Sequence, residues 1–346
     1  MVDFAGWLLP VQYPTGPKEE HRRVREAAGL FDIDHMGQIT VSGPDALAYL
    51  QSVMTADVAR FALGEANYSL MCYADGTVVD DVFIYRLPDR YFIAVNASNN
   101  DKDTRWLEHH RAGLDVEVRN VSAETYMLAL QGPRAEAILQ PLAGEDLSAL
   151  ERHHVIETQV AGVDAIVGRT GYTGEDGFEL YFPAEHAGAV WDALLEAGAP
   201  HGLLPAGLAA RDTLRLEAAL PLYGQEISPS ITPFAARLGW VVSFDKGPFV
   251  GREALLKERL EGPARRLIGL RMTEGGVARH GYPIVSAEGE PIGEVTSGSY
   301  GPAVDAFIGL GLVAPEHART GTAIGVEIRG RVKPAVVVRL PFYKAS

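Results

Sequence analysis

The chain has 346 residues, a formal net charge of −14 at pH 7 and a hydrophobic fraction of 47%. This length accommodates two or three domains with sizeable cores, and the acidic balance argues against a general nucleic-acid binder, because phosphate neutralisation needs a basic surface. Cys72 is the one cysteine, so no internal disulfide or cysteine-based zinc site is expected, and no apolar run reaches the ~20 residues of a membrane span.

The N-terminal stretch MVDFAGWLLP is apolar, but it has neither a basic leader nor a cleavage site. We therefore expect no signal peptide and a soluble cytoplasmic protein, without nucleic-acid or membrane partners.

The chain up to residue 260 mixes helical and strand-like patterns. Residues 15–31 read as a helix, because Pro17 suits its first position, acids precede bases and Gly29 suits its end. Further helices are predicted at residues 44–53, 101–112, from 133 onward, 184–196, 205–220 and 252–260. Strands are predicted at residues 38–42, 67–72, 77–86, 91–97, 124–131, 165–170 and 178–182. This mixture predicts an α+β fold with two interleaved subdomains.

The pattern changes near residue 263. From Arg265 onward, short alternating runs such as LIGLRM, AIGVEIRG and KPAVVVRL are separated by turn residues, with almost no helical signal. This spacing predicts a small antiparallel barrel or sandwich. With Gly262 and Pro263 as a linker, we expect one region at residues 1–258 and a C-terminal β-barrel domain at residues 264–346.

The stretch GRTGYTGEDGFELYF, residues 168–182, carries the most specific signal. Turn chemistry accounts for Gly174, Asp176 and Gly177, and a plain hairpin is one reading. It does not account for Glu179, an acid that stands between Phe178 and Leu180 in an apolar strand. Such an acid either faces water or accepts hydrogen bonds from a specific group.

Two adjacent acids, Asp80 and Asp81, lie within the apolar strand VVDDVFIYR. Neighbouring strand residues face opposite sides, so the two carboxylates have different surroundings. A carboxylate that points into a core or cleft is costly unless it is paired or hydrogen-bonded, and is a candidate for charge stabilisation or acid–base work. The alternative is a structural acid that pairs with a local base.

Arg211 and Arg215 lie four residues apart and share one face of the predicted helix at residues 205–220. Asp212 and Glu217 offer internal partners, so at least one of these arginines is expected to form a structural salt bridge. The functional reading is that an arginine of this helix binds a carboxylate or polar ring of a ligand.

Segments spread over nearly the whole chain together carry a family resemblance. They are MVDFAGW, GLFDIDHMG, NYSLM, VVDDV, VNASN, LQGP, RTGYTGEDGFEL, PAGLAARDTLRLEA, PLYGQE, GWVV, FVGREAL and TSG. In this order they closely resemble the T-proteins of the glycine cleavage system, which are tetrahydrofolate-dependent aminomethyltransferases. The resemblance implies a three-domain cloverleaf around a folate channel, with the C-terminal barrel as its third domain.

The resemblance also implies roles for individual residues. Asp81 matches the family's key acid, which faces the reactive nitrogens of the folate, and Glu179 matches the acid that binds the pterin ring. Further folate-site positions implied by the match are Tyr172, Arg211, Met36, Tyr68, Tyr85 and Asn96. Tyr343 in the tail RLPFYK is an additional candidate. No metal is implied.

The implied reaction moves the carbon of an aminomethyl group from the dihydrolipoyl arm of a carrier, the H-protein, to tetrahydrofolate. The products are 5,10-methylenetetrahydrofolate, ammonia and the free dithiol. Tetrahydrofolate is thus a co-substrate, and lipoylated H-protein is the expected protein partner. A fixed carboxylate such as Asp81 would stabilise the positive charge that develops on the carbon and nitrogen.

Other members of the same fold leave alternatives open. A free-standing tetrahydrofolate-dependent demethylase of a small N- or S-methyl compound is the main one. Folate-binding assembly factors for iron–sulfur proteins carry a cysteine near the position of PLYGQE, where this chain has Pro221 and Leu222. A catalytically inactive carrier-binding subunit is disfavoured, because Asp81, Glu179 and Arg211 are all present.

Overall fold

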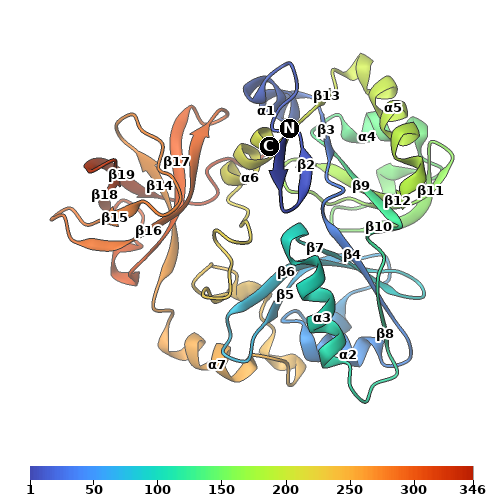
Figure 1. The fold of residues 1–346 in the computed structure, drawn as a ribbon, viewed down its shortest axis with the longest axis horizontal. Coiled ribbons are helices and arrows are strands. Elements are labelled where there is room, and N and C mark those ends of the chain that lie inside the picture. Colours follow the sequence, from blue (N-terminus) through green and yellow to red (C-terminus); the bar gives the residue numbers. More distant parts are fainter. Residues whose placement is uncertain (346) are drawn as a thin grey trace. The chain divides into compact units, whose positions relative to one another are not determined.

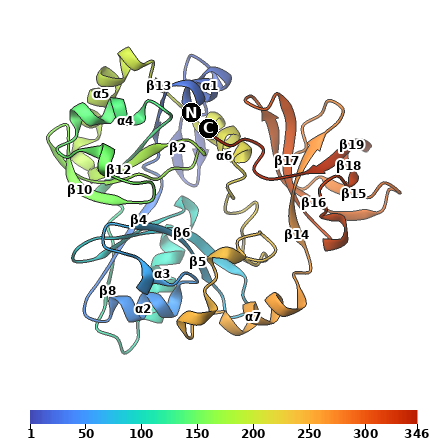
Figure 2. The same cartoon turned by 180° about the vertical axis from the view of Figure 1, so that it is seen from behind.

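The computed structural model describes residues 1–345 of the chain. The chain divides into two compact units. Their helices and strands are labelled in Figures 1 and 2. The first comprises Met1–Ser69 and Asp80–Arg211, and the second comprises Leu70–Val79 together with the chain from Asp212 onward. Within residues 1–345, no helix combines the length and the apolar character needed to cross a membrane.

A six-stranded sheet forms one layer of the first unit. Its order is β10 (Val155–Val160), β11 (Val163–Gly168), β12 (Gly177–Pro183), β9 (Thr125–Gln131), β3 (Gly29–Asp32) and β13 (Leu204–Pro205). Helices α4 (Ala135–Leu139) and α5 (Ala187–Gly198) pack their apolar side chains against it in one continuous buried cluster. Every residue of β12 except Pro183 is buried, so this strand holds Glu179 within the core of the sheet.

A five-stranded sheet belongs mostly to the same unit, and only its residues 70–72 and 78–79 are assigned to the second unit. Its order is β5 (Ala66–Cys72), β6 (Val78–Arg86), β7 (Tyr91–Val95), β4 (Gly37–Ser42) and β8 (Glu117–Asn120). Helices α2 (Ala46–Val53) and α3 (Asn100–His110) accompany it, and the Tyr49 hydroxyl donates to the Leu107 carbonyl to join them. A short N-terminal hairpin pairs β1 (Val2–Phe4) with β2 (Trp7–Leu9).

One predicted helix is wrong over its last residues. Helix α1 covers Pro17–Glu26, with Pro17 in its first turn, whereas Gly29–Asp32 forms β3. Strand β3 pairs with β9 on one side and with β13 on the other, and Leu30 and Phe31 are buried there. These partners are distant in sequence, so a helical pattern that fits locally is overridden by sheet pairing.

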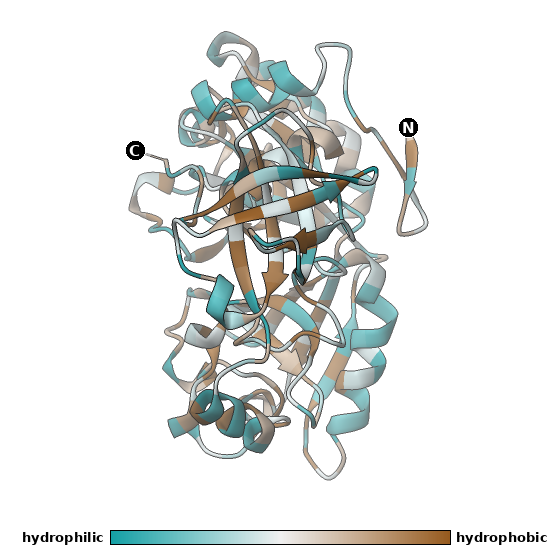
Figure 3. Ribbon diagram, turned by 90° about the vertical axis from the view of Figure 1, so that its left-hand side faces the viewer, coloured by the Kyte–Doolittle hydropathy of each residue, from teal (hydrophilic) through white to brown (hydrophobic). Residues whose placement is uncertain are grey.

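The second unit contains the predicted C-terminal barrel. The closed barrel has the order β14 (Arg266–Met272), β17 (Ala306–Val313), β16 (Pro291–Gly301), β15 (Pro283–Val285), β18 (Ala323–Ile328) and β19 (Arg331–Val338). Helix α7 (Arg252–Glu261) precedes it. Hydrophobic stretches run along the barrel strands in Figure 3, and their inward side chains form a separate buried core. The mixed α+β prediction and the barrel prediction are therefore confirmed.

Arg215 forms the structural salt bridge predicted for this part of the chain. Helix α6 covers Leu208–Glu217, and Arg215 near its end is 2% exposed. Its guanidinium lies 3.0 Å from Oε2 of the buried Glu226 and 2.7 Å from Oδ1 of Asp212, and it donates to the Ser297 hydroxyl. A buried charge with these partners is satisfied, so Arg215 holds the second unit together.

Candidate functional site

Strand β6 presents Asp81 on one face and Asp80 on the other, as strand alternation requires. Asp80 is fully buried, whereas Asp81 keeps partial surface exposure although protein atoms surround its carboxyl group. Burial, followed by repulsion from Asp80, raises the pKa of Asp81 from 3.8 to about 7. A half-buried acid whose carboxyl pKa lies near neutral pH is a candidate for chemistry.

Asn96 joins the two acids. It directly follows strand β7, and its Nδ2 donates to Asp81 Oδ1 at 2.6 Å and to Asp80 Oδ1 at 2.9 Å. The Tyr68 hydroxyl donates to the other oxygen, Asp81 Oδ2, at 3.0 Å. Two donors from two different strand regions therefore fix the orientation of the Asp81 carboxylate.

A row of aromatic rings leads from Asp81 toward Glu179. Tyr68 contacts Phe83 with centroids 6.1 Å apart, and Phe83 contacts Tyr85 at 5.9 Å. Asp81, Phe83 and Tyr85 occupy alternate positions of β6 and so share one face of the sheet. The Tyr85 hydroxyl then donates to Glu179 Oε2 at 3.0 Å.

Glu179 is held from one side only. Its Oε2 accepts hydrogen bonds from the hydroxyls of Tyr85 and Thr170, and the Tyr85 hydroxyl also contacts that of Tyr181 at 2.9 Å. Burial, and then the charge of Glu179, raise the pKa of Tyr85, which therefore remains a donor. Among the described residues, the other carboxylate oxygen, Oε1, accepts no hydrogen bond, so it is available to a ligand donor.

Tyr172 and Arg211 form the third part of the site. Tyr172 lies in the loop between β11 and β12, and the Arg211 guanidinium carbon lies 4.7 Å from the centre of its ring. This cation–π contact places a positive charge beside an aromatic face. Burial, and then the positive charge of Arg211, lowers the pKa of His35 to about 3, so His35 is neutral.

The loop that carries Tyr172 is fastened by buried polar contacts. Gln131 at the end of β9 accepts a hydrogen bond from the Thr173 hydroxyl at 2.8 Å and donates to the Thr170 carbonyl at 3.0 Å. Arg25 from α1 forms an ion pair with Glu175 at 2.8 Å, and both side chains are 6% exposed. The loop therefore has one well-defined conformation, because loosening it would leave buried polar groups unsatisfied.

Replacing Gly171 with alanine is expected to lower the free energy of unfolding by about 1–3 kcal/mol. A Cβ atom at Gly171 would lie 1.9 Å from Gln131 Oε1, and Gln131 cannot move without breaking both of its hydrogen bonds to the loop. Denaturant unfolding measures the change. Gly188→Ala in α5 is the matched control, because no atom lies within 4 Å of its added Cβ. Equal stability of both variants would contradict this account of the loop.

Of the other residues predicted for the site, Met36 and Tyr85 belong to the first unit and Tyr343 to the second. Met36 is partly exposed in the turn between β3 and β4 of the first unit. Tyr85 is fully buried, so it contacts Glu179 and its neighbours rather than open space. Tyr343 belongs to the second unit, where its backbone N–H donates to the Glu217 carbonyl. The first unit thus joins Asp81, Asn96, Tyr68 and Glu179 by direct contacts or through Phe83 and Tyr85. Tyr172 and Arg211 form a separate pair in the same unit, and Tyr172 lies two residues after Thr170, which binds Glu179.

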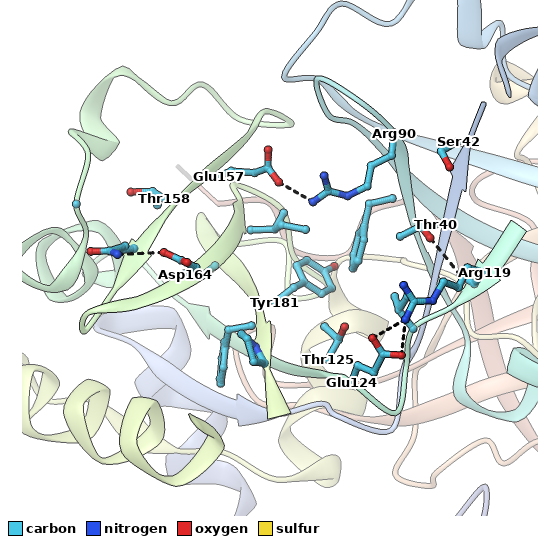
Figure 4. A pocket seen from close by; sticks show the side chains of 18 of the residues that line it. Thr40, Ser42, Arg90, Arg119, Glu124, Thr125, Glu157, Thr158, Asp164 and Tyr181 are labelled. Atoms are coloured by element: carbon cyan, nitrogen blue, oxygen red, sulfur yellow. Dashed lines mark hydrogen bonds and ion pairs between the residues drawn. The ribbon is translucent and has the colours of Figure 1, made fainter. Parts of the chain in front are cut away.

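A large groove in the first unit lies elsewhere. It has a volume of about 960 Å³ and is lined from both sheets of that unit, but by none of the residues predicted for the site. Its two arginines are already paired, Arg90 with Glu157 at 2.6 Å and Arg119 with Glu124 at 2.7 Å (Figure 4). An open and acidic surface with paired cations offers little to an anionic ligand, so we assign none to it.

Comparisons with known proteins agree over the whole chain. Residues 1–246 match the family model described as the GCVT N-terminal domain, and residues 265–344 match the glycine cleavage T-protein C-terminal barrel domain. Curated aminomethyltransferases are similar, with 53% identity in Moorella thermoacetica over 99% of this chain and 94% of that protein. The Geobacillus kaustophilus protein is 51% identical over 100% of this chain and 95% of its own length.

A solved structure has the same fold. The crystal structure of glycine cleavage system aminomethyltransferase T from Bartonella henselae superimposes with a TM-score of 0.94 and 37% sequence identity. The match covers 99% of this chain and 94% of that one.

Proposed function

The chain belongs to the glycine cleavage T-protein family and is an aminomethyltransferase, and we propose that it transfers the methylene carbon of an aminomethyl group from lipoylated H-protein to tetrahydrofolate. The products would be ammonia, the free dihydrolipoyl dithiol and 5,10-methylenetetrahydrofolate. The observation that carries this proposal is the pair of fixed carboxylates, Asp81 and Glu179, joined by one aromatic row within the first unit.

The donor set around Glu179 fits a pterin ring. Tyr85 and Thr170 occupy Oε2, whereas Oε1 accepts no hydrogen bond among the described residues. A pterin presents a ring N–H next to an exocyclic amino group, and a carboxylate accepts such adjacent donors well. Because Tyr85 is fully buried, we propose that it positions Glu179 and that Glu179 itself contacts the ring.

The remaining first-unit residues would provide walls and a charge. Tyr68 and Tyr172 offer ring faces, Met36 offers an adaptable thioether, and such groups suit a flat ligand. Arg211, stacked on Tyr172, would contribute a positive charge near a polar part of the ligand. Tyr343, which belongs to the second unit, stays a candidate on the family match alone.

Bound tetrahydrofolate would supply the nitrogens that accept the transferred carbon. Asp81 would act on the donor side of the reaction: as the carbon–sulfur bond to the lipoyl arm breaks, positive charge develops on the carbon and on the nitrogen that later leaves as ammonia. A carboxylate fixed by Tyr68 and Asn96 stabilises that charge without having to reorient. Asn96 would thus contribute by orienting Asp81.

Carrier-dependent transfer is the test of this function. We expect the protein to release tetrahydrofolate from 5,10-methylenetetrahydrofolate, ammonia and reduced lipoylated H-protein, and to run the reverse reaction from the aminomethylated carrier. H-protein without its lipoyl group is the matched control and should support no turnover, because it lacks the thiol that holds the carbon. Tight folate binding without carrier-dependent turnover would instead favour a tetrahydrofolate-dependent demethylase of a small N- or S-methyl compound.

A further inference from the structure

A third acid, Asp103, lies beside the two acids of strand β6. It is the fourth residue of α3, and both Asp103 and Asp80 are 0% exposed. Asn99, which lies one helical turn before Asp103, donates to Asp80 Oδ1 at 2.7 Å, so Asp103 is on the helix face that meets Asp80, and both of its oxygens are buried without a hydrogen-bond partner among the described residues. Two ionised carboxylates have four acceptor oxygens and no hydrogen to share, so a hydrogen bond between Asp103 and Asp80 requires a proton on one of them.

The surrounding donors identify which member of the pair is ionised. Asp80 accepts three hydrogen bonds, from the Asn96 backbone N–H at 3.1 Å, from Asn96 Nδ2 at 2.9 Å and from Asn99 Nδ2 at 2.7 Å. Neither oxygen of Asp103 accepts one among residues 1–345. Lys102 forms an ion pair with Asp103, with 3.7 Å between Nζ and Oδ1, a distance longer than that of a hydrogen bond. A carboxylate with three donors is the charged partner, and the one with none is the acid.

We infer that Asp103 is held as a neutral carboxylic acid that donates its proton to Asp80, and that it thereby acts as a positioning residue for Asn96 and Asp81. The inferred hydrogen bond would link Asp103 to Asp80, which accepts from the Asn96 amide, and that amide also donates to Asp81. Because Asp103 keeps its proton, the cluster of Asp80, Asp81 and Asp103 carries one negative charge fewer. The effect on turnover, though not the proton itself, rests on the proposed function.

The protonation state of Asp103 can be measured without any activity. In protein labelled with ¹³C at the aspartate carboxyl carbons, one resonance should keep the chemical shift of the protonated acid from about pH 5 to about pH 9, far above the ordinary aspartate range. It should be missing from Asp103→Asn and retained in Asp101→Ala, a change of an exposed acid in the same helical turn. Spectra in which every aspartate is ionised at pH 9 would overturn the inference, whatever the protein catalyses.

Turnover measurements on two variants distinguish a positioning role of Asp103 from a role in packing alone. Asparagine can donate to Asp80 as the neutral acid does, so Asp103→Asn should keep kcat within about threefold of wild type, whereas Asp103→Ala should lower it by about 10- to 100-fold, as small misplacements of reacting groups do. The ionisation of Asp81 predicts that kcat/KM falls at low pH, which is the acid limb of the pH profile. Replacing one neutral group with another at position 103 should leave the pH of this fall unchanged. If Asp103→Asn were as impaired as Asp103→Ala, or moved that limb to lower pH, Asp103 would be an ionised group and the inference would fail.

Discussion

Replacing Asp81 with asparagine is expected to lower kcat by about 100- to 1,000-fold, the usual cost of removing one preorganised electrostatic group from an active site. The dissociation constant for tetrahydrofolate should change by less than about threefold, because Asp81 would act on charge that develops only in the transition state. Isothermal titration with tetrahydrofolate and single-turnover transfer from the aminomethylated carrier measure the two quantities separately.

The asparagine side chain fits the existing hydrogen bonds. Its carbonyl oxygen can accept from Asn96 Nδ2, and its amide can donate to the Tyr68 hydroxyl, which reverses the direction of the present 3.0 Å contact. The fold should therefore persist, and an unchanged melting temperature is the control. If Asp81→Asn lost folate binding while remaining folded, Asp81 would be a binding residue and its proposed role would be wrong.

The pH dependence gives the same prediction a second readout. The pKa of Asp81 is raised to about 7, by burial first and then by Asp80, and the ionised form is the one that stabilises positive charge. Hence kcat/KM should fall as the pH drops below about 7, and Asp81→Asn should abolish that acid limb. The hydrogen bond from Tyr68 lowers the pKa of Asp81, so Tyr68→Phe should move the limb to higher pH.

The fold was predictable where the pattern is local. The apolar run at residues 77–86 predicts strand β6, and evenly spaced turns predict the barrel. The sequence predicts a helix for residues 29–31, because their strand identity depends on pairing with β9 and β13, which are about 100 and 175 residues away. Strand β8 was not predicted, since it is a short edge strand with three of its four residues exposed.

The site was partly predictable for a similar reason. An acid inside an apolar strand is conspicuous, and this marked Asp81 and Glu179. Nothing in the sequence distinguishes Asp103, because it lies in the charged run NDKDTRWLEHH, which has the composition of a solvated helix. Its burial depends on how α3 packs on its sheet. Likewise, Tyr85 was predicted to line a pocket, and its full burial beneath Glu179 could be read only from the structure.

Replacing Glu179 with glutamine is expected to weaken tetrahydrofolate binding by about 10- to 100-fold, since hydrogen bonds to a charged group contribute about 1.5–3 kcal/mol. The glutamine carbonyl can still accept from Tyr85 and Thr170, whose hydroxyls now bind Oε2. Its amide would then stand where Oε1 is free and would present donors to the donors of the pterin. The protein should therefore stay folded, but N–H donors of the glutamine would face N–H donors of the pterin.

Glu179→Gln should differ from Asp81→Asn in kind as well as in size. At saturating tetrahydrofolate its kcat should stay within about threefold of wild type, because an interaction made equally in ground state and transition state affects KM alone. Tyr85→Phe is the matched control: it keeps the buried ring and removes the hydroxyl that holds Oε2, so it should weaken binding less than Glu179→Gln. If Glu179→Gln lowered kcat at saturation as strongly as Asp81→Asn, Glu179 would act on the reacting atoms, and the division of work between the two carboxylates would be wrong.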